Sequence, residues 1–146
     1  MDFHTIFRSR CLITDGAMGT YYSEKYGKGS GSPENDNLTA PQRIEEIHRE
    51  YIEAGADILR TNSFASNIRT LCAGNAGSMT REEQLRTVYE NVAAACRIAQ
   101  SAAEQEQSRA EEEGPRIKEI YIAGDIGPVP EKRGDEEKDA ELTEEY

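Results

Sequence analysis

Apolar and polar positions along this chain alternate between short strand-like runs and longer helical stripes. Apolar runs of strand length occupy residues 11–14, 56–61 and 117–123, and each ends at polar residues or glycines. Between the first two runs, apolar and aromatic positions recur at helical spacing on one face: Ile44, Ile47, His48, Tyr51 and Ile52. Strands that alternate with helices predict a parallel sheet with right-handed crossovers, and therefore an α/β fold.

Capping signals predict where the two main helices begin and end. Thr39 and Gln42 form a capping-box pair before the first helix, and Gly55 ends it. Thr80 and Glu83 form a second capping-box pair that opens a longer helical pattern. Both helices are therefore expected to start at side chains that bond to free backbone N–H groups.

The remaining segments complete the predicted order of elements, which is strand, helix, strand, helix, strand and the start of a further helix. Glycine and serine predict a surface loop at residues 23–36, and residues 67–71 predict a short helix. Residues 131–146 form the acidic start of another helix. Three strands covered on one side leave two unpaired edges and an open sheet face, so we expect residues 1–146 to be the truncated first part of a larger α/β domain.

Charge and composition exclude several functional classes. The net charge is −11, and residues 104–113 and 131–146 carry −4 and −5 of it, which is typical of solvated helix or loop faces. Such a chain is not expected to bind nucleic acid through its electrostatic field. It has no apolar run of membrane-spanning length, no signal peptide and three unpaired cysteines, so we expect a cytoplasmic protein that contacts no membrane.

Candidate binding residues follow each predicted strand. Asp15 and Gly16 follow the first strand, Thr61 and Asn62 end the second, and Asp125 follows the third. Ligand sites of parallel α/β folds lie at the carboxyl ends of the strands, so these residues predict one shared pocket. There Asp15 can accept hydrogen bonds from a substrate ammonium, and Gly16 lets a substrate approach the backbone. A tight turn in which Asp15 bonds its own backbone is the alternative.

Other motifs point away from nucleotide or metal binding. Residues 15–20 lack the third glycine of a dinucleotide fingerprint and the Gly-Lys-Ser/Thr ending of a P-loop. His48 lies on an apolar helix face, as packed histidines do. Cys11, Cys72 and Cys96 show no Cys-x-x-Cys or Cys/His spacing, so no self-contained metal site is expected.

Several short motifs, taken together and in order, resemble the homocysteine S-methyltransferase family. They lie at residues 15–20, 37–38, 47–48, 54–57, 61–64 and 123–128. The set is specific although no single piece is. The last motif, Gly-Asp-Ile-Gly-Pro, is most similar to bacterial enzymes in which this domain is fused to a methylenetetrahydrofolate reductase.

The resemblance implies a TIM (β/α)₈ barrel that methylates the thiol of homocysteine to give methionine, with this chain as about three N-terminal β/α units. In the family, a zinc ion binds the substrate sulfur as thiolate and lowers the thiol pKa. By resemblance, Asp15 meets the substrate ammonium and Gly16 offers its amide to the carboxylate. Thr61 and Asn62 line the same pocket, and Asp125 either belongs to it or holds its strand end.

The chain departs from the family pattern at the zinc ligands, which in the family are cysteines late in a barrel of about 250 residues. None of Cys11, Cys72 or Cys96 matches a ligand position. We therefore expect that this chain neither binds zinc tightly nor methylates homocysteine alone. Its expected partners are homocysteine, a methyl donor that the sequence does not identify, and a complementary C-terminal half or a fused reductase domain. The alternative is a non-catalytic α/β binding or scaffold module derived from the same fold.

Overall fold

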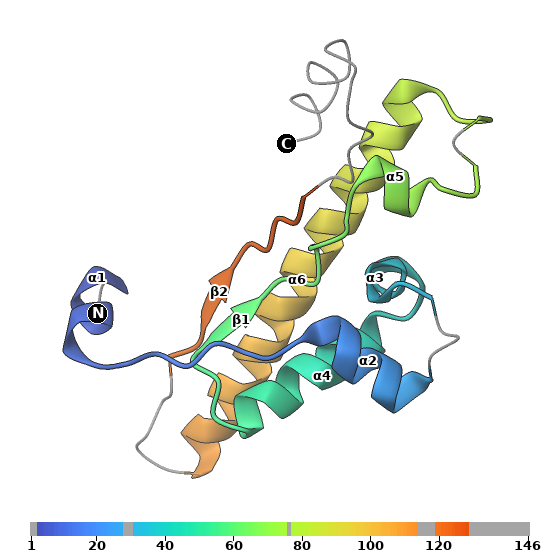
Figure 1. The fold of residues 1–146 in the computed structure, drawn as a ribbon. Coiled ribbons are helices and arrows are strands. Elements are labelled where there is room, and N and C mark those ends of the chain that lie inside the picture. The colour runs from blue at the N-terminus through green and yellow to red at the C-terminus, as the bar shows by residue number, and fades with distance from the viewer. Residues whose placement is uncertain (1–2, 28–30, 76, 114–118, 129–146) are drawn as a thin grey trace.

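The structure is a computed structural model that describes residues 3–27, 31–75, 77–113 and 119–128. A long helix, α6, runs the length of the molecule behind two short strands, and α4 packs against it (Figure 1). In chain order the elements are α1 (Phe3–Ser9), α2 (Met18–Tyr26), the 3-10 turn η1 (Pro33–Asn35), α3 (Asp36–Thr39), α4 (Pro41–Glu53), β1 (Ile58–Arg60), α5 (Ile68–Leu71), α6 (Arg81–Glu113) and β2 (Tyr121–Ala123).

The described strands form a parallel sheet, which confirms the predicted α/β class. β1 and β2 pair in parallel with Leu59 opposite Ile122. Both strands are shorter than the runs 56–61 and 117–123 that predicted them, and residues 117–118 lie outside the described residues.

The predicted first strand, residues 11–14, is reduced to a single parallel bridge between Thr14 and Ile58. The Asp15 N–H donates to the Ile58 carbonyl at 2.9 Å, so the segment does lie alongside β1. However, the Ile13 N–H donates to the Asp57 carboxylate at 3.0 Å. A side chain thus replaces a backbone acceptor, and the ladder stops there. The predicted strand is therefore confirmed only as a parallel bridge at Thr14.

The helix ends agree with the capping prediction at one helix and differ at the other. At α6, the Thr80 N–H donates to Glu83 Oε2 at 2.8 Å and the Glu83 N–H donates to Thr80 Oγ1 at 3.3 Å, which confirms the capping box. The Thr39–Gln42 box was wrong, because Ala40 is the residue before α4 and Thr39 belongs to α3. Thr39 Oγ1 instead donates to Asp36 Oδ1 at 2.7 Å.

Much of the predicted loop at residues 23–36 has helical structure. Residues 23–26 are the last turns of α2, and η1 begins at Pro33. The buried Tyr22 hydroxyl donates to the Asp36 carboxylate, which ties α2 to α3 across the segment. Residues 28–30, like the predicted helix at 131–146, lie outside the described residues.

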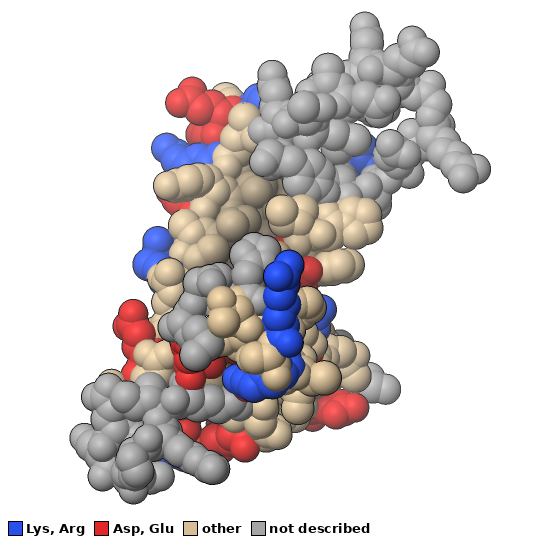
Figure 2. Space-filling view, turned by 90° about the vertical axis from the view of Figure 1, so that its left-hand side faces the viewer, with Lys and Arg blue, Asp and Glu red and all other residues tan. Residues whose placement is uncertain are grey.

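The core lies between α4, α6 and the sheet. The apolar face of α4 packs against α6, where buried alanines allow a close approach of the two helices. The largest clusters of buried core residues are Tyr22, Ile44, Ile47 and Ile98, and Ile52, Leu59, Ala102, Ala103 and Ile120. Acidic and basic side chains are interspersed around the margins of the face in Figure 2, as expected for solvated surfaces.

His48 lies fully buried on α4, as expected of a packed histidine. Neither ring nitrogen has a hydrogen-bond partner among the described residues. Burial lowers the pKa of the imidazole to about 4, because the charged form would lose its hydration without gaining a partner. The side chain is therefore held in its neutral form at neutral pH.

Protonation of His48 should weaken the fold in acid. The pKa is about 4 in the folded chain and near 6.5 in the unfolded one, so the neutral ring stabilises the fold in full above pH 6.5. About 3 kcal/mol of unfolding free energy is lost as the pH falls from 6.5 to 4. Urea unfolding of His48→Leu across this range is expected to show a shallower acid limb than that of the unaltered chain.

The core substitution Ile47→Val serves as the control for this experiment. It should lower the free energy of unfolding equally at every pH, because it removes a methyl group and no titratable group. A His48→Leu curve parallel to that of the unaltered chain would contradict the role given to His48.

Candidate functional site

The carboxyl ends of the three parallel segments meet around Arg60, the last residue of β1. The Arg60 N–H donates to Asp15 Oδ2 and its Nε donates to Asp15 Oδ1, each at 2.9 Å. Its Nη2 donates to the Gly16 carbonyl at 2.7 Å, and its Nη1 lies 3.7 Å from Asp125 Oδ2. We call Asp15, Arg60 and Asp125 the charged corner.

Burial and charge set the ionisation of the charged corner. The side chain of Asp15 is only 2 % exposed. Burial raises its pKa above the ordinary value, and the bonds from Arg60 partly oppose that rise. The same bonds raise the pKa of Arg60, which therefore stays charged. When both carboxylates are ionised, the charged corner carries two negative charges and one positive charge, so its net charge is negative.

Arg60 is not among the residues predicted from the sequence, although the sequence holds a signal for it. It is a charged residue inside an apolar strand run, directly before the Thr-Asn motif. A charge at that position needs a partner at the strand end, and Asp15 supplies it.

Gly16 is required for packing in a way that the sequence did not indicate. A Cβ atom on Gly16 would lie 2.8 Å from the Tyr51 hydroxyl oxygen and 2.9 Å from Cε1 of the same ring. The missing side chain therefore makes room for Tyr51 of α4. The predicted role of the Gly16 amide towards a substrate carboxylate remains a prediction.

Thr61 holds the backbone of Asp125 in place. Its buried Oγ1 accepts a hydrogen bond from the Asp125 N–H at 2.9 Å and lies 2.7 Å from Ser63 Oγ. Ser63 Oγ donates to the Asp125 carbonyl at 2.7 Å. Two hydroxyl groups thus fix the backbone on both sides of the Asp125 side chain.

Asn62 belongs to a buried network of amides that the sequence did not reveal. Its Nδ2 donates to Asn37 Oδ1 at 2.8 Å and to the Pro33 carbonyl at 2.9 Å. Asn37 Nδ2 donates to Asn91 Oδ1 at 2.9 Å, and Asn91 Nδ2 donates to the Glu34 carbonyl at 2.8 Å. The only sequence signal for Asn91 is a polar residue between the apolar positions 88 and 92 of α6. The network joins η1 and α3 to the end of β1.

A cavity of about 460 Å³ opens beside these residues. Arg60, Thr61, Asn62 and Asp125 line it. Asp15 and Gly16 are not among its lining residues and reach it through Arg60. The remaining lining residues include the first turn of α2 and residues 32–34.

Glu34 is a further carboxylate on the cavity wall, and both of its oxygens accept hydrogen bonds from the protein. Its Oε1 accepts the Ala65 N–H at 3.0 Å, and its Oε2 accepts the Ser32 hydroxyl. Glu34 therefore joins the turn before α3 to the loop after β1.

The described residues do not offer the ligands of a metal site. Among them, no group of three or more His, Cys, Asp or Glu side chains could hold a metal ion. Cys11 is exposed, Cys72 is buried and Cys96 is half-buried. The zinc implied by the family resemblance does not fit these residues. In the same part of the chain, no helix is both long and apolar enough to cross a membrane.

Parallel strands whose carboxyl ends carry a charged, hydrogen-bonded cavity define an α/β protein with a polar cavity at the strand ends. A family model described as homocysteine S-methyltransferase matches residues 12–146. The chain therefore belongs to the homocysteine S-methyltransferase family.

Two mycobacterial methionine synthases are similar to this chain but far longer. The enzyme from Mycobacterium tuberculosis is 29 % identical over 133 residues, which cover 87 % of this chain and 10 % of that protein. The enzyme from Mycobacterium leprae is 29 % identical over 126 residues, which cover 82 % and 9 %. The chain thus spans about a tenth of these relatives.

The fold is also similar to solved structures of the Escherichia coli homocysteine methyltransferase MmuM. The metallated form superposes with a TM-score of 0.65 at 20 % identity, covering 86 % of this chain and 41 % of that one. The oxidized form gives 0.67 at 22 % identity, covering 86 % and 40 %. At this identity the likeness concerns the fold, and it extends over about two fifths of the solved chains.

Gly127 should be required for the contact between the loops that follow β1 and β2. A Cβ atom there would lie 2.2 Å from the Phe64 carbonyl oxygen, which also accepts the Gly127 N–H at 3.1 Å. Gly127→Ala is therefore expected to lower the free energy of unfolding by about 1–3 kcal/mol in urea denaturation. The matched control is Gly124→Ala, whose Cβ would meet nothing within 4 Å. Equal losses for the two variants would contradict this account.

Proposed function

We propose that this chain provides the amino-acid-binding part of a homocysteine S-methyltransferase, which transfers a methyl group to the homocysteine thiol to form methionine. The observation that carries the proposal is the charged corner beside a cavity of about 460 Å³ within a member of this family. An α-amino acid carries one charge of each sign, and Arg60 and Asp125 present the complementary pair on the cavity wall.

Four of the five residues chosen from sequence keep their proposed roles in this site, and the fifth, Asp15, is bonded to Arg60. Thr61 and Asn62 shape the wall through their buried hydrogen bonds, and Asp125 offers a carboxylate to the cavity. Gly16 is proposed to give its amide to the substrate carboxylate. Direct binding of the ammonium by Asp15 would require Arg60 to move, because both Asp15 oxygens are bonded to Arg60.

We also propose that the described segments are the first three β/α units of a (β/α)₈ barrel. The parallel order and the site at the carboxyl edge support this, since barrel sites lie at that edge. Ile13, Ile122, Phe64 and Ile126 are exposed on or near the strands, where further units of a barrel would pack. A complementary C-terminal half is the proposed occupant. It, or a fused methylenetetrahydrofolate reductase domain, would bring what the described residues lack for methyl transfer.

The second candidate function is binding without catalysis. It is favoured by one observation: the cavity lies within the described residues, whereas no metal-holding group does. Both candidates require homocysteine to bind at the charged corner, and they differ in whether a complementary part completes a reaction centre.

Homocysteine binding is the direct test of the shared part of the proposal. Calorimetric titration of the 146-residue chain with L-homocysteine under reducing conditions is expected to show saturable binding. Thr61→Val should weaken it about tenfold, because the Asp125 N–H loses its acceptor and the carboxylate loses its position. Thr87→Val, which removes an exposed hydroxyl on α6, should leave binding unchanged. Absence of binding by a folded chain would contradict the proposal.

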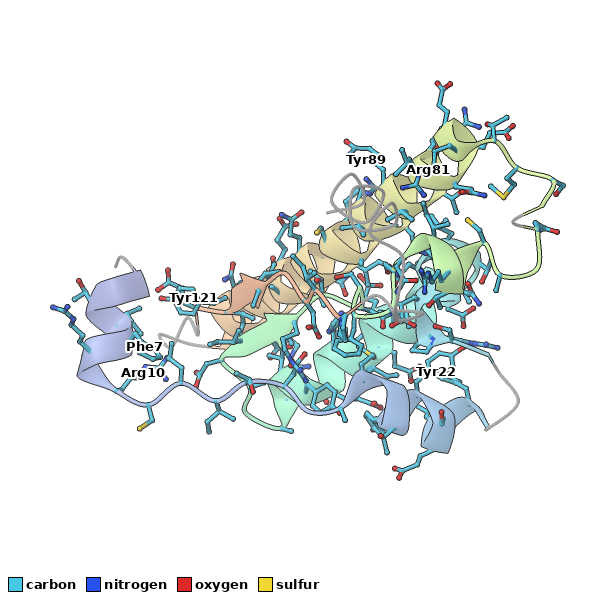
Figure 3. All side chains as sticks on the ribbon, turned by 45° about the horizontal axis from the view of Figure 1, so that its top comes forward. Phe7, Arg10, Tyr22, Arg81, Tyr89 and Tyr121 are labelled. Carbon is cyan, nitrogen blue, oxygen red and sulfur yellow. The ribbon has the colours of Figure 1, made fainter. Side chains whose placement is uncertain are left out.

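A measurement of self-association distinguishes the two candidates, a portion of a larger barrel and an independently folded binding module. Unpacked apolar residues near the strands should make the chain associate with itself as its concentration rises, as measured by light scattering. Ile126→Lys is expected to reduce this association. The control is Tyr89→Lys on α6 (Figure 3), because Tyr89 and Ile126 are both 74 % exposed. A monomer that melts cooperatively at all concentrations would favour the non-catalytic module.

A further inference from the structure

We propose that a second cavity, between α2 and α4, binds the ammonium end of an alkylammonium ligand. The two helices lie side by side, and residues of both line this cavity of about 390 Å³ (Figure 1). Its size falls within the range of small-molecule sites. The inference goes beyond the proposed function, because the cavity is separate from the one at the strand ends. Of the described lining residues, the two cavities share only Ala17.

Aromatic rings and small side chains make most of the cavity wall apolar. Tyr21 of α2 and Tyr51 of α4 meet edge to face, with ring centroids 5.7 Å apart and ring planes at 67°. Ala17 and Ala54 line the cavity beside them. Two rings at this angle form a corner against which an alkyl chain can pack, and the face of a tyrosine ring attracts a cation.

Two carboxylates give the cavity a negative charge. Glu24 of α2 and Glu50 of α4 line it, and none of its described lining residues is basic. Lys25, which is not a lining residue, has its Nζ 2.5 Å from Glu50 Oε1 and 2.9 Å from Glu46 Oε1. One ammonium is thus shared between two carboxylates, and Glu24 adds a third. The charge of this group is negative, so it attracts a further cation and repels an anion.

Glu50 has a hydrogen-bond acceptor without a donor. Its Oε1 accepts from Lys25, whereas its Oε2 is buried and accepts no hydrogen bond from the described residues. The Tyr21 hydroxyl is near enough for Glu50 to raise the pKa of Tyr21, but its geometry does not make a hydrogen bond to Oε2. A buried acceptor without a donor is unfavourable. A ligand ammonium that reaches Glu50 would supply the missing N–H group.

An ammonium at the end of an alkyl chain matches both parts of the cavity. The chain can pack between the rings of Tyr21 and Tyr51, while the ammonium meets the glutamates. Free alkylamines and the lysine side chains of proteins share this chemistry. Tyr51 also packs on Gly16, whose carbonyl accepts a hydrogen bond from Arg60, so the cavity adjoins the charged corner without belonging to it.

The test is a titration of the 146-residue chain at neutral pH in phosphate buffer, followed through the NMR signals of the Tyr21 and Tyr51 rings. The probes are n-butylamine, 1-butanol as its uncharged counterpart, and Nα-acetyl-L-lysine methylamide as a lysine side chain within a peptide. The amine should bind about tenfold or more tightly than the alcohol, because only the amine carries a charge. Tighter binding of the lysine derivative than of n-butylamine assigns the site to a lysine of a protein, and the reverse order assigns it to a free amine.

The carboxylates are tested by variants that keep the shape of the side chain. Glu50→Gln should weaken n-butylamine by about tenfold and leave 1-butanol unchanged. The matched control is Glu53→Gln on the same helix, because Glu53 also pairs with a cation, Arg109 at 3.1 Å, but does not line the cavity. It should leave both probes unchanged. Glu24→Gln, at an exposed position, tests the same charge if Glu50→Gln does not fold.

The aromatic corner is tested at Tyr21, with the Tyr51 ring as the reporter. Tyr21→Phe keeps the ring and should bind n-butylamine as the unaltered chain does. Tyr21→Leu removes the ring and should bind it several-fold more weakly. Tyr89→Leu, at an exposed tyrosine of α6, is the control and should leave binding unchanged (Figure 3).

Two results would overturn the proposed site. One is equal affinity of the unaltered chain for n-butylamine and 1-butanol, and absence of binding by both counts as the same result. The other is unchanged amine binding in the folded glutamate variants. None of the probes carries an α-amino acid head group, and none of the altered residues lines the strand-end cavity. These results therefore leave the proposed function standing, and a failure of homocysteine binding would leave this site standing.

Discussion

The ion pair between Asp15 and Arg60 is the interaction on which the site depends. It joins the segment before α2 to the end of β1, and Arg60 in turn approaches Asp125 after β2. Without Asp15, the guanidinium would stand at the strand ends beside only one distant carboxylate. Without Arg60, Asp15 would be a buried carboxylate with its main partner removed, which is strongly unfavourable. One pair therefore aligns three separate parts of the chain.

Uncharged hydrogen bonds around this pair determine the shape of the cavity. Thr61 and Ser63 fix the backbone of Asp125, and the amides of Asn37, Asn62 and Asn91 connect η1, β1 and α6. These groups are buried, so each needs its partner, and the positions of the loops are coupled. These buried bonds therefore fix the polar wall of the cavity.

Local patterns in the sequence predicted the parts of the fold that short-range physics controls. The apolar face of α4, its end at Gly55 and the capping box of α6 follow from residues close together in the chain, and the structure has all three. The capping box at Thr39 failed because Thr39 belongs to the short helix α3, so that Ala40 is the residue before α4. The strand at residues 11–14 is reduced to a bridge because the distant Asp57 carboxylate takes the Ile13 amide.

The sequence by itself determined the α/β order, the motifs of the homocysteine S-methyltransferase family and the gathering of Asp15, Thr61, Asn62 and Asp125 at one edge. Only the tertiary structure decided what each of these side chains bonds to. It placed Asp15 against Arg60 and turned Thr61 towards Asp125, while Asn62 joined the buried amides. The physical reason is that periodicity and capping act within a few residues. A buried polar group, by contrast, takes whichever partner the folded chain brings within hydrogen-bond distance, here 45 and 64 positions away.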